Sequence, residues 1–159
     1  MGERQRILDL VDRAYRAEAW HGPSLLECLD GVGASLAAKR PLKGVRSIWE
    51  LVEHIASWNE IVARRLAGKI TNVTPELNFP PITKTTPAAW KASRARLART
   101  QAAFRRVVAR FPVARLGRQR PKTDQSWNVL IHGQIQHGLY HAGQITMLRR
   151  ALGKPVASH

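Results

Sequence analysis

Three histidines in the sequence have the type and spacing that a metal site requires. His137 and His141 are four residues apart, so in a helix they lie on one face, about 40° from each other. Leu130 and Leu148 share that sector of the helix, which marks it as the apolar side. His54 falls on the apolar half of its own helical wheel. We therefore expect all three imidazole rings to point into the interior of the protein.

A neutral imidazole that is removed from water needs one partner for its N–H group and another for its bare nitrogen. A single buried histidine usually finds a backbone carbonyl or a hydroxyl group. A stacked pair with a third inward-facing ring favours a divalent ion instead, because the metal satisfies all three lone pairs and keeps coordination positions open. Three nitrogen ligands suit zinc or nickel, and iron and manganese are alternatives.

The histidine pair does not complete the helical motif of the zinc proteases. In that motif a glutamate follows the first histidine and acts as the general base, whereas the residue here is Gly138. A base would have to come from elsewhere in the chain. The nearest carboxylate by spacing is Glu50, one turn before His54, although a solvated residue of a helix cap is the simpler interpretation of Glu50.

Other residues near the histidines can orient a ligand ring or line a pocket. Tyr140 and Gln144 flank the histidines of the last helix, and either ligand orientation or simple packing explains them. Trp58 can form a wall of the pocket beside His54, although a tryptophan buried in the core is the simpler interpretation. Cys28 lies in an apolar helical turn, which favours an inert buried thiol over a nucleophile.

Helical periodicity and cap residues predict four long helices that position these side chains. They cover, in chain order, a first region from about residue 3 to the break at Gly22-Pro23, residues 47–67, residues 86–111, and a last helix from Asp124 or Ser126 to residue 152. The connection over residues 69–85 is long and contains three prolines, and such a loop in a compact domain is often functional. The sequence thus predicts an all-α domain over residues 1–159, a four-helix bundle with a long crossover connection.

The composition is typical of a folded protein of the cytoplasm. Of the 159 residues, 44% are hydrophobic and 23% are charged, which fits one folded domain rather than a disordered tail. No apolar run approaches the roughly 18 residues that a membrane span needs. The charged residues near the N-terminus argue against a signal peptide. A single cysteine allows no intrachain disulfide, which favours a reducing compartment.

The charge balance is strongly basic. The formal net charge is +15, and residues 91–122 contain eleven basic residues and no acidic one. A polyanion such as a nucleic acid is one partner that this stretch could bind. A solvated basic surface is the simpler interpretation, because no aromatic interleaving and no nucleic-acid motif accompanies the charge.

Four segments resemble the DinB/YfiT-like superfamily. Residues 132–145, HGQIQHGLYHAGQI, resemble its C-terminal signature, and residues 47–59, SIWELVEHIASWN, resemble its signature in the second helix. Residues 20–24 and 65–68 are also similar to the family, so the resemblance covers nearly the whole chain. One difference is Arg46, where relatives often carry a histidine.

The resemblance implies a four-helix bundle, commonly a homodimer, with a metal site formed by His54, His137 and His141. Some relatives are thiol S-transferases that use a low-molecular-weight thiol such as bacillithiol or mycothiol, and others are described as metal-dependent hydrolases. The function expected on this basis is that of a metal-dependent enzyme acting on a small molecule. The alternatives are a metal-binding or stress-response protein without catalysis and a nucleic-acid binder that uses the basic surface.

Overall fold

The chain folds into helices joined by loops, and no strand occurs among the residues that are described. The computed structural model describes residues 1–16 and 18–156. The elements are α1 (Glu3–Tyr15), α2 (Leu25–Cys28), α3 (Ala34–Ala38), α4 (Ile48–Leu66), α5 (Pro75–Asn78), α6 (Pro87–Arg110), a 3-10 turn η1 (Val113–Arg115) and α7 (Trp127–Ala151). The all-α prediction is confirmed. Within the described ranges, no helix is both long enough and apolar enough to cross a membrane.

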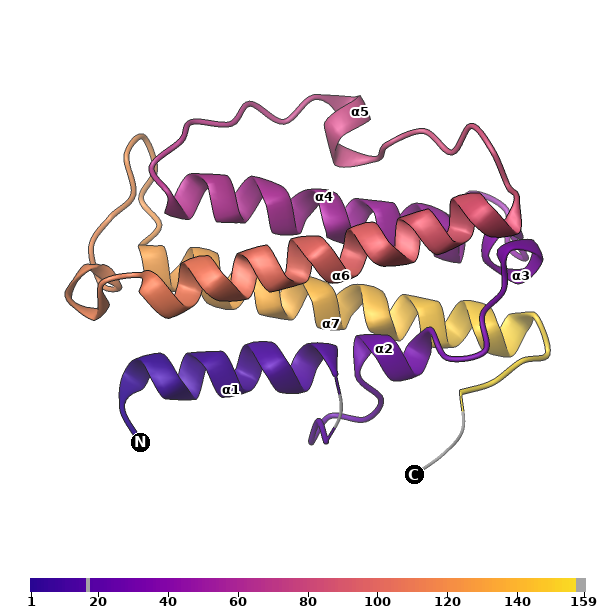
Figure 1. Cartoon of the computed structure of the whole chain (residues 1–159), viewed down its shortest axis with the longest axis horizontal. Coiled ribbons are helices and arrows are strands. Elements are labelled where there is room, and N and C mark those ends of the chain that lie inside the picture. The colour runs from indigo at the N-terminus through magenta and orange to yellow at the C-terminus, as the bar shows by residue number, and fades with distance from the viewer. Residues whose placement is uncertain (17, 157–159) are drawn as a thin grey trace.

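The long helices α1, α4, α6 and α7 lie side by side and form the predicted bundle (Figure 1). α4 packs against both α6 and α7, and α1 packs against the same two helices. One apolar cluster forms around Trp49 and Ile145, and a second forms around Phe104 and Ile131. Because α4 is held between its neighbours along its whole length, it is a rigid support for side chains that need a fixed position.

The helices begin where the cap residues predict. The Ser47 side chain accepts the N–H of Glu50 at 3.2 Å, and the Glu50 carboxylate accepts the N–H of Ser47 at 2.9 Å. This reciprocal capping box satisfies two N–H groups that have no partner inside α4. Thr86 caps α6, and Ser126 rather than Asp124 caps α7. The boundaries of α4, α6 and α7 therefore agree with the sequence prediction to within about two residues.

The connection between α4 and α6 contains a short helix that the sequence did not predict. Thr74 caps α5 by accepting the N–H of Leu77 at 3.2 Å, and Pro75 occupies its first turn. Both residues lie in the connection over residues 69–85, for which the sequence predicts a loop. Figure 1 shows α5 above α4, so the crossover folds back over the helix that carries His54. The sequence also did not predict α3, and α2 follows directly after its cap residue Ser24.

Several arginines of the basic stretch have partners inside the fold. Arg96 donates to Glu53 at 2.7 Å and to Glu60 at 2.9 Å, which ties α6 to α4. Arg105 donates to Asp12 at 2.8 Å and so ties α6 to α1. These ion pairs give part of the positive charge a structural role. Binding of a nucleic acid by the rest of the stretch stays a prediction.

Candidate metal centre

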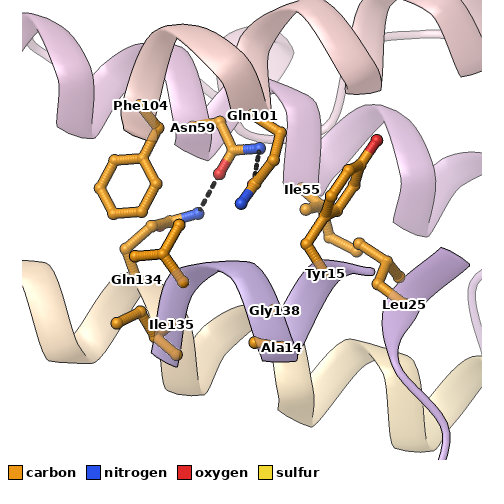
Figure 2. A pocket seen from close by; sticks show the side chains of 11 residues that line it. Ala14, Tyr15, Leu25, Ile55, Asn59, Gln101, Phe104, Gln134, Ile135 and Gly138 are labelled. Carbon is orange, nitrogen blue, oxygen red and sulfur yellow. Dashed lines mark hydrogen bonds between the residues drawn. The ribbon is translucent and has the colours of Figure 1, made fainter. Parts of the chain in front are cut away.

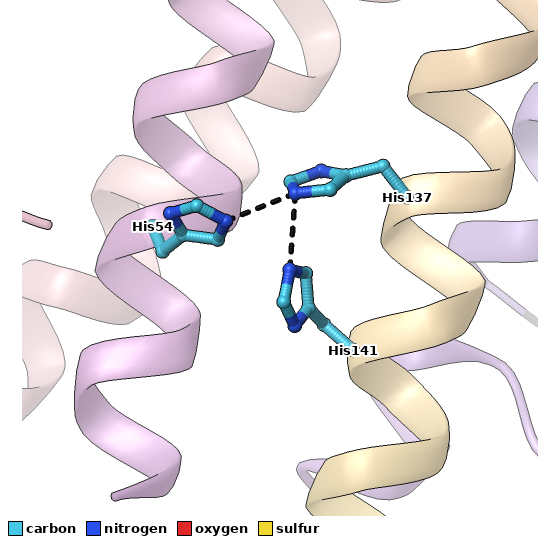
Figure 3. A group of neighbouring side chains, drawn as sticks. All are labelled: His54, His137 and His141. Atoms are coloured by element: carbon cyan, nitrogen blue, oxygen red, sulfur yellow. Dashed lines mark hydrogen bonds between the residues drawn. The ribbon is translucent and has the colours of Figure 1, made fainter. Parts of the chain in front are cut away.

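The three histidines predicted to face inward meet between α4 and α7. Nε2 of His137 lies 2.9 Å from Nε2 of His54 and 3.0 Å from Nε2 of His141. All three ligand atoms lie within 4.8 Å of one another. Figure 3 shows His54 reaching across from α4 to the two rings that α7 presents on consecutive turns. The predicted convergence is confirmed, and this cluster can hold a metal ion.

The crossover fixes the ring of His54. Its Nδ1 lies 2.6 Å from the backbone carbonyl of Asn78. A carbonyl only accepts hydrogen bonds, so Nδ1 must carry the proton and Nε2 keeps a lone pair. Phe79 stacks on the same ring, with centroids 4.0 Å apart and planes 9° apart. The tautomer and the orientation of His54 are thus set by residues at the end of α5.

Gln144 has the same effect on His141. Nδ1 of His141 lies 2.6 Å from Oε1 of Gln144, one turn further along α7. With Nδ1 as the donor, Nε2 of His141 also presents a lone pair to the cluster. The hypothesis that Gln144 orients a ligand ring therefore fits the structure. Tyr140 packs edge-on against His141 with centroids 5.1 Å apart, but its side chain is 65% exposed and contributes little to the core.

His137 lies between two nitrogens that both need a positive partner. Its Nδ1 is buried without a hydrogen-bond partner, and its Nε2 faces the lone pairs of His54 and His141. A neutral ring carries one proton, so at most one of these two contacts can be a hydrogen bond. The protein alone cannot satisfy this cluster.

The surroundings keep the rings neutral. Burial, together with the neighbouring His141 and His54, lowers the pKa of His137 to about 3. Burial also lowers the pKa of His54, although the carbonyl of Asn78 opposes the change. The pKa of His141 is lowered by burial and partly restored by Gln144. Neutral imidazole is the form that binds a metal, so the site offers three ligands at neutral pH.

A divalent cation fits this donor set. A cation among the three Nε2 atoms would turn the unsatisfied nitrogen contacts into ligand bonds. Tetrahedral zinc with Zn–N bonds of about 2.0–2.1 Å holds its nitrogens about 3.3–3.4 Å apart. The observed separations of 2.9 and 3.0 Å are a few tenths of an ångström shorter. Small side-chain movements would open the cluster to that size.

The cluster borders a cleft of about 430 Å³, a size typical of small-molecule sites. His54 and His137 line it together with Trp58, which donates from Nε1 to Oδ1 of Asn78 at 2.9 Å. Trp58 is half-buried: it packs against the apolar core and also forms a wall of the cleft, so the interpretation as a pocket residue fits the structure.

Glu50 is a cap residue, as expected, but it is not solvated. It is only 8% exposed, and it pairs with Arg40 at 2.6 Å and Arg46 at 2.8 Å. Burial opposes ionisation, but the N–H of Ser47 and the two guanidinium groups outweigh burial and lower its pKa to about 2. Its carboxylate is occupied and contacts none of the three histidines. Arg46 also stacks on the ring of Phe79 at 4.3 Å, and Phe79 in turn packs against His54.

A second buried polar cluster connects the same helices. Gln134 of α7 donates to Oδ1 of Asn59 at 2.8 Å, and Asn59 of α4 donates to Oε1 of Gln101 at 3.0 Å. Figure 2 shows these amides in line beside a small cavity of about 20 Å³. Here each donor faces an acceptor, so this cluster is satisfied by protein atoms alone.

Cys28 is buried, as expected, and its thiol contacts Thr146. Burial raises the pKa of this thiol, which makes the reactive thiolate scarce at neutral pH.

Sequence reasoning missed Asn78 and Phe79, the two residues that fix His54. The length of the 69–85 connection was the only signal that pointed towards them.

Comparison with known proteins gives one finding. The sequence model of the DinB superfamily matches residues 19–145, which include the three histidines and the helices that carry them. No curated protein and no solved structure matches the chain.

Proposed function

The chain belongs to the DinB superfamily, and from this premise we propose that it is a divalent-metal-dependent enzyme acting on a small molecule. His54, His137 and His141 would hold the ion, with zinc or nickel as the metals that suit three imidazoles. One observation carries the proposal. Three converging Nε2 atoms, which the protein cannot satisfy by itself, lie beside a cleft of small-molecule size.

A divalent ion held by the three histidines would supply Lewis acidity, which would lower the pKa of a thiol or water and so make it a nucleophile at neutral pH. The residues of the chain do the rest. Asn78 and Gln144 keep the Nε2 atoms of His54 and His141 free of protons. Trp58 and Leu130 give the cleft apolar walls against which a substrate can pack.

Transfer of a thiol to an electrophile is favoured over hydrolysis. Among the described residues that line the cleft none is acidic, so no carboxylate is placed to take a proton from water. A thiol needs less help, because its unperturbed pKa is about 8.5 whereas that of water is about 15.7. In the transfer, the thiol sulfur bonds to the electrophilic carbon. The leaving group departs with its electron pair, and the thiol proton goes to solvent.

Elemental analysis of the purified protein tests the first part of this proposal. We expect about one divalent ion per chain in the wild type and none in a variant with His54, His137 and His141 all changed to alanine. His132→Ala is a matched control, because His132 is on α7 but outside the cluster. An equal metal content in all three proteins would remove the histidine cluster as a metal site.

The second part is tested with the metal-loaded protein, a panel of low-molecular-weight thiols and a chromogenic electrophile. We expect at least one thiol to react faster than with the His141→Ala variant. Metal uptake without any such rate, and without hydrolysis of ester or amide probes, would identify a metal-binding protein with no catalytic role.

We also propose that the protein is a cytoplasmic homodimer. α7 carries no charged side chain before Arg149, and it exposes Tyr140 and Met147. In a chain with a net charge of +15, this uncharged face is where two copies meet with the least repulsion. Sedimentation analysis should give a dimer for the wild type and a monomer for Met147→Arg. A monomeric wild type would contradict the proposal.

A further inference from the structure

Two arginines face the cleft beside the histidines without a carboxylate partner. Arg65, at the end of α4, and Arg120, in the loop before α7, both line it. These two segments lie at the same end of the bundle, on the left in Figure 1. Neither arginine forms an ion pair within residues 1–16 and 18–156. The charge at this end of the cleft is therefore uncompensated.

Their remaining contacts leave donors free. Arg120 donates from Nη2 to Oε1 of Gln125 at 2.7 Å, but its Nε is buried and has no hydrogen-bond partner. Arg65 makes one long hydrogen bond of 3.3 Å to the carbonyl of Thr71, and its guanidinium lies 5.7 Å from the ring of Trp58. A buried guanidinium N–H without an acceptor is costly, so an acceptor is expected in the bound state.

The two cations also repel each other. Burial lowers the pKa of Arg65, and the positive charge of Arg120 lowers it further. Two other half-buried arginines have carboxylate partners: Arg96 pairs with Glu53 and Glu60, and Arg105 pairs with Asp12. An anion between Arg65 and Arg120 would compensate both charges and the free Nε at once.

Backbone N–H groups near the cleft are not free to bind the anion, so the two arginine side chains would bind it. The first N–H groups of α7, which could bind an anion at a helix N-terminus, are already used. Trp127 donates to the carbonyl of Arg118, and Asn128 donates to that of Leu116. Val129 and Leu130 add apolar surface to the cleft. Guanidinium groups beside apolar walls suit a carboxylate on a carbon chain, since the guanidinium fork matches a carboxylate.

We propose that Arg65 and Arg120 bind the carboxylate of a small organic acid whose other end reaches His54 and His137. The orientation of this acid rests on the proposed function, because the histidines would mark the reacting end. The carboxylate can belong to the thiol or to the electrophile. In both cases the cleft selects reactants with a negative charge at one end and an apolar chain between the two ends.

Calorimetric titration with hexanoate and with hexan-1-ol tests the arginine pair without any reaction. The purified wild type should bind hexanoate at least about tenfold more tightly than the alcohol. Arg65→Met and Arg120→Met, which keep an apolar stem, should each weaken hexanoate binding about tenfold. Arg64→Met and Arg118→Met are matched controls, because both residues are exposed and both changes remove one positive charge. Equal affinity for the two probes, or equal losses in the control variants, would overturn the proposal.

The same titration on the metal-free variant in which all three histidines are alanine, together with the metal content of the wild type, separates this inference from the proposed function. Hexanoate binding that depends on both arginines, in a wild type that takes up no metal, supports the arginine site and removes the metal enzyme. Metal uptake with no preference for hexanoate does the opposite.

Matched reactants then identify the source of the carboxylate. A thiol and an electrophile are each tested with and without a carboxylate, on the wild type and on Arg65→Met. The pair whose KM rises about tenfold in the variant, with little change in kcat, carries the bound carboxylate. A KM that changes for neither pair would contradict a role in substrate binding.

Discussion

Two buried polar clusters join α4 to α7, and they differ in what they lack. In the amide cluster, Gln134 donates to Asn59 and Asn59 donates to Gln101. In the histidine cluster, His137 faces two nitrogens whose protons are directed away from it. The helices and the depth are similar, but donors and acceptors balance in only one of the two clusters.

The difference shows how a buried polar group can be assigned to stability or to ligand binding. A cluster whose hydrogen bonds are complete fixes the packing of its helices and needs nothing else. A cluster with converging lone pairs and too few protons is incomplete until a cation arrives. Counting protons on oriented rings therefore separates the two roles better than burial, since both clusters are buried.

Removal of the central ring should have the largest effect. We expect His137→Ala to lower the affinity for zinc more than about 100-fold, because two lone pairs alone bind a metal weakly. Competition with a chromophoric chelator measures the affinity. The fold should persist by circular dichroism, and an unchanged affinity would mean that the cluster is not the metal site.

Removal of the central amide should instead affect stability. Asn59→Ala leaves both Gln134 and Gln101 without a partner in the core, which should lower the free energy of unfolding by about 2 kcal/mol. Urea unfolding followed by tryptophan fluorescence measures the loss. Zinc affinity should stay within about twofold of the wild type, and a larger loss would show that the two clusters are coupled.

Removal of a residue that orients a ligand should give a smaller change in the same property as His137→Ala. Gln144→Leu leaves all three imidazoles in place but releases the proton on Nδ1 of His141. The affinity for zinc should fall about tenfold. The same chelator competition measures it, with His132→Ala as the control on the same helix. No change would indicate that packing alone orients His141.

A fall in pH should have the smallest of these effects, and it should lower the free energy of unfolding through the histidine cluster only. In the metal-free protein the pKa of His137 is about 3, below the value of about 6.5 expected when the chain is unfolded. The unfolded state therefore binds more protons between these values, so stability is full above pH 6.5 and falls as the pH falls towards 3. From pH 6 to pH 5, His137 should therefore lower the free energy of unfolding by about 1 kcal/mol.

Urea unfolding at both pH values measures this contribution. The His137→Asn variant should lose about 1 kcal/mol less than the wild type over this interval. The Asn59→Ala variant should keep the pH dependence of the wild type, because amides do not titrate. An identical slope for His137→Asn and the wild type would contradict the assignment of a low pKa to His137.

The sequence predicted the parts of this structure that depend on local periodicity. The side of α4 that carries His54, and the i, i+4 pair on α7, follow from helix geometry, and the caps Ser47 and Ser126 set the helix starts. Two long amphipathic helices must bury their apolar faces against each other. This is why the convergence of the three rings could be predicted.

The missed features all depend on contacts between distant segments. Asn78 and Phe79 reach His54 only because the crossover folds back over α4, and no periodic pattern encodes that path. Glu50 is buried because Arg40, ten residues away, closes over it together with Arg46. A loop conformation and a long-range ion pair are set by the whole fold, so the sequence indicated a functional loop without its residues.

The attachment of the crossover to α4 has a consequence for how this protein can change in length. Leu77 and Asn78 are fastened by their carbonyls and the Asn78 side chain to Ser57, His54 and Trp58. The stretch before α5, residues 69–73, has fewer attachments to α4: the N–H of Lys69 donates to the carbonyl of Arg64, and Arg65 makes a long hydrogen bond of 3.3 Å to the carbonyl of Thr71. Extra residues inserted there would form a larger surface loop and leave the centre intact. One residue added between Asn78 and Pro80 would displace Phe79 from its position against His54. Among natural variants, the number of residues before α5 should therefore vary, whereas the number between α5 and Pro80 should stay constant.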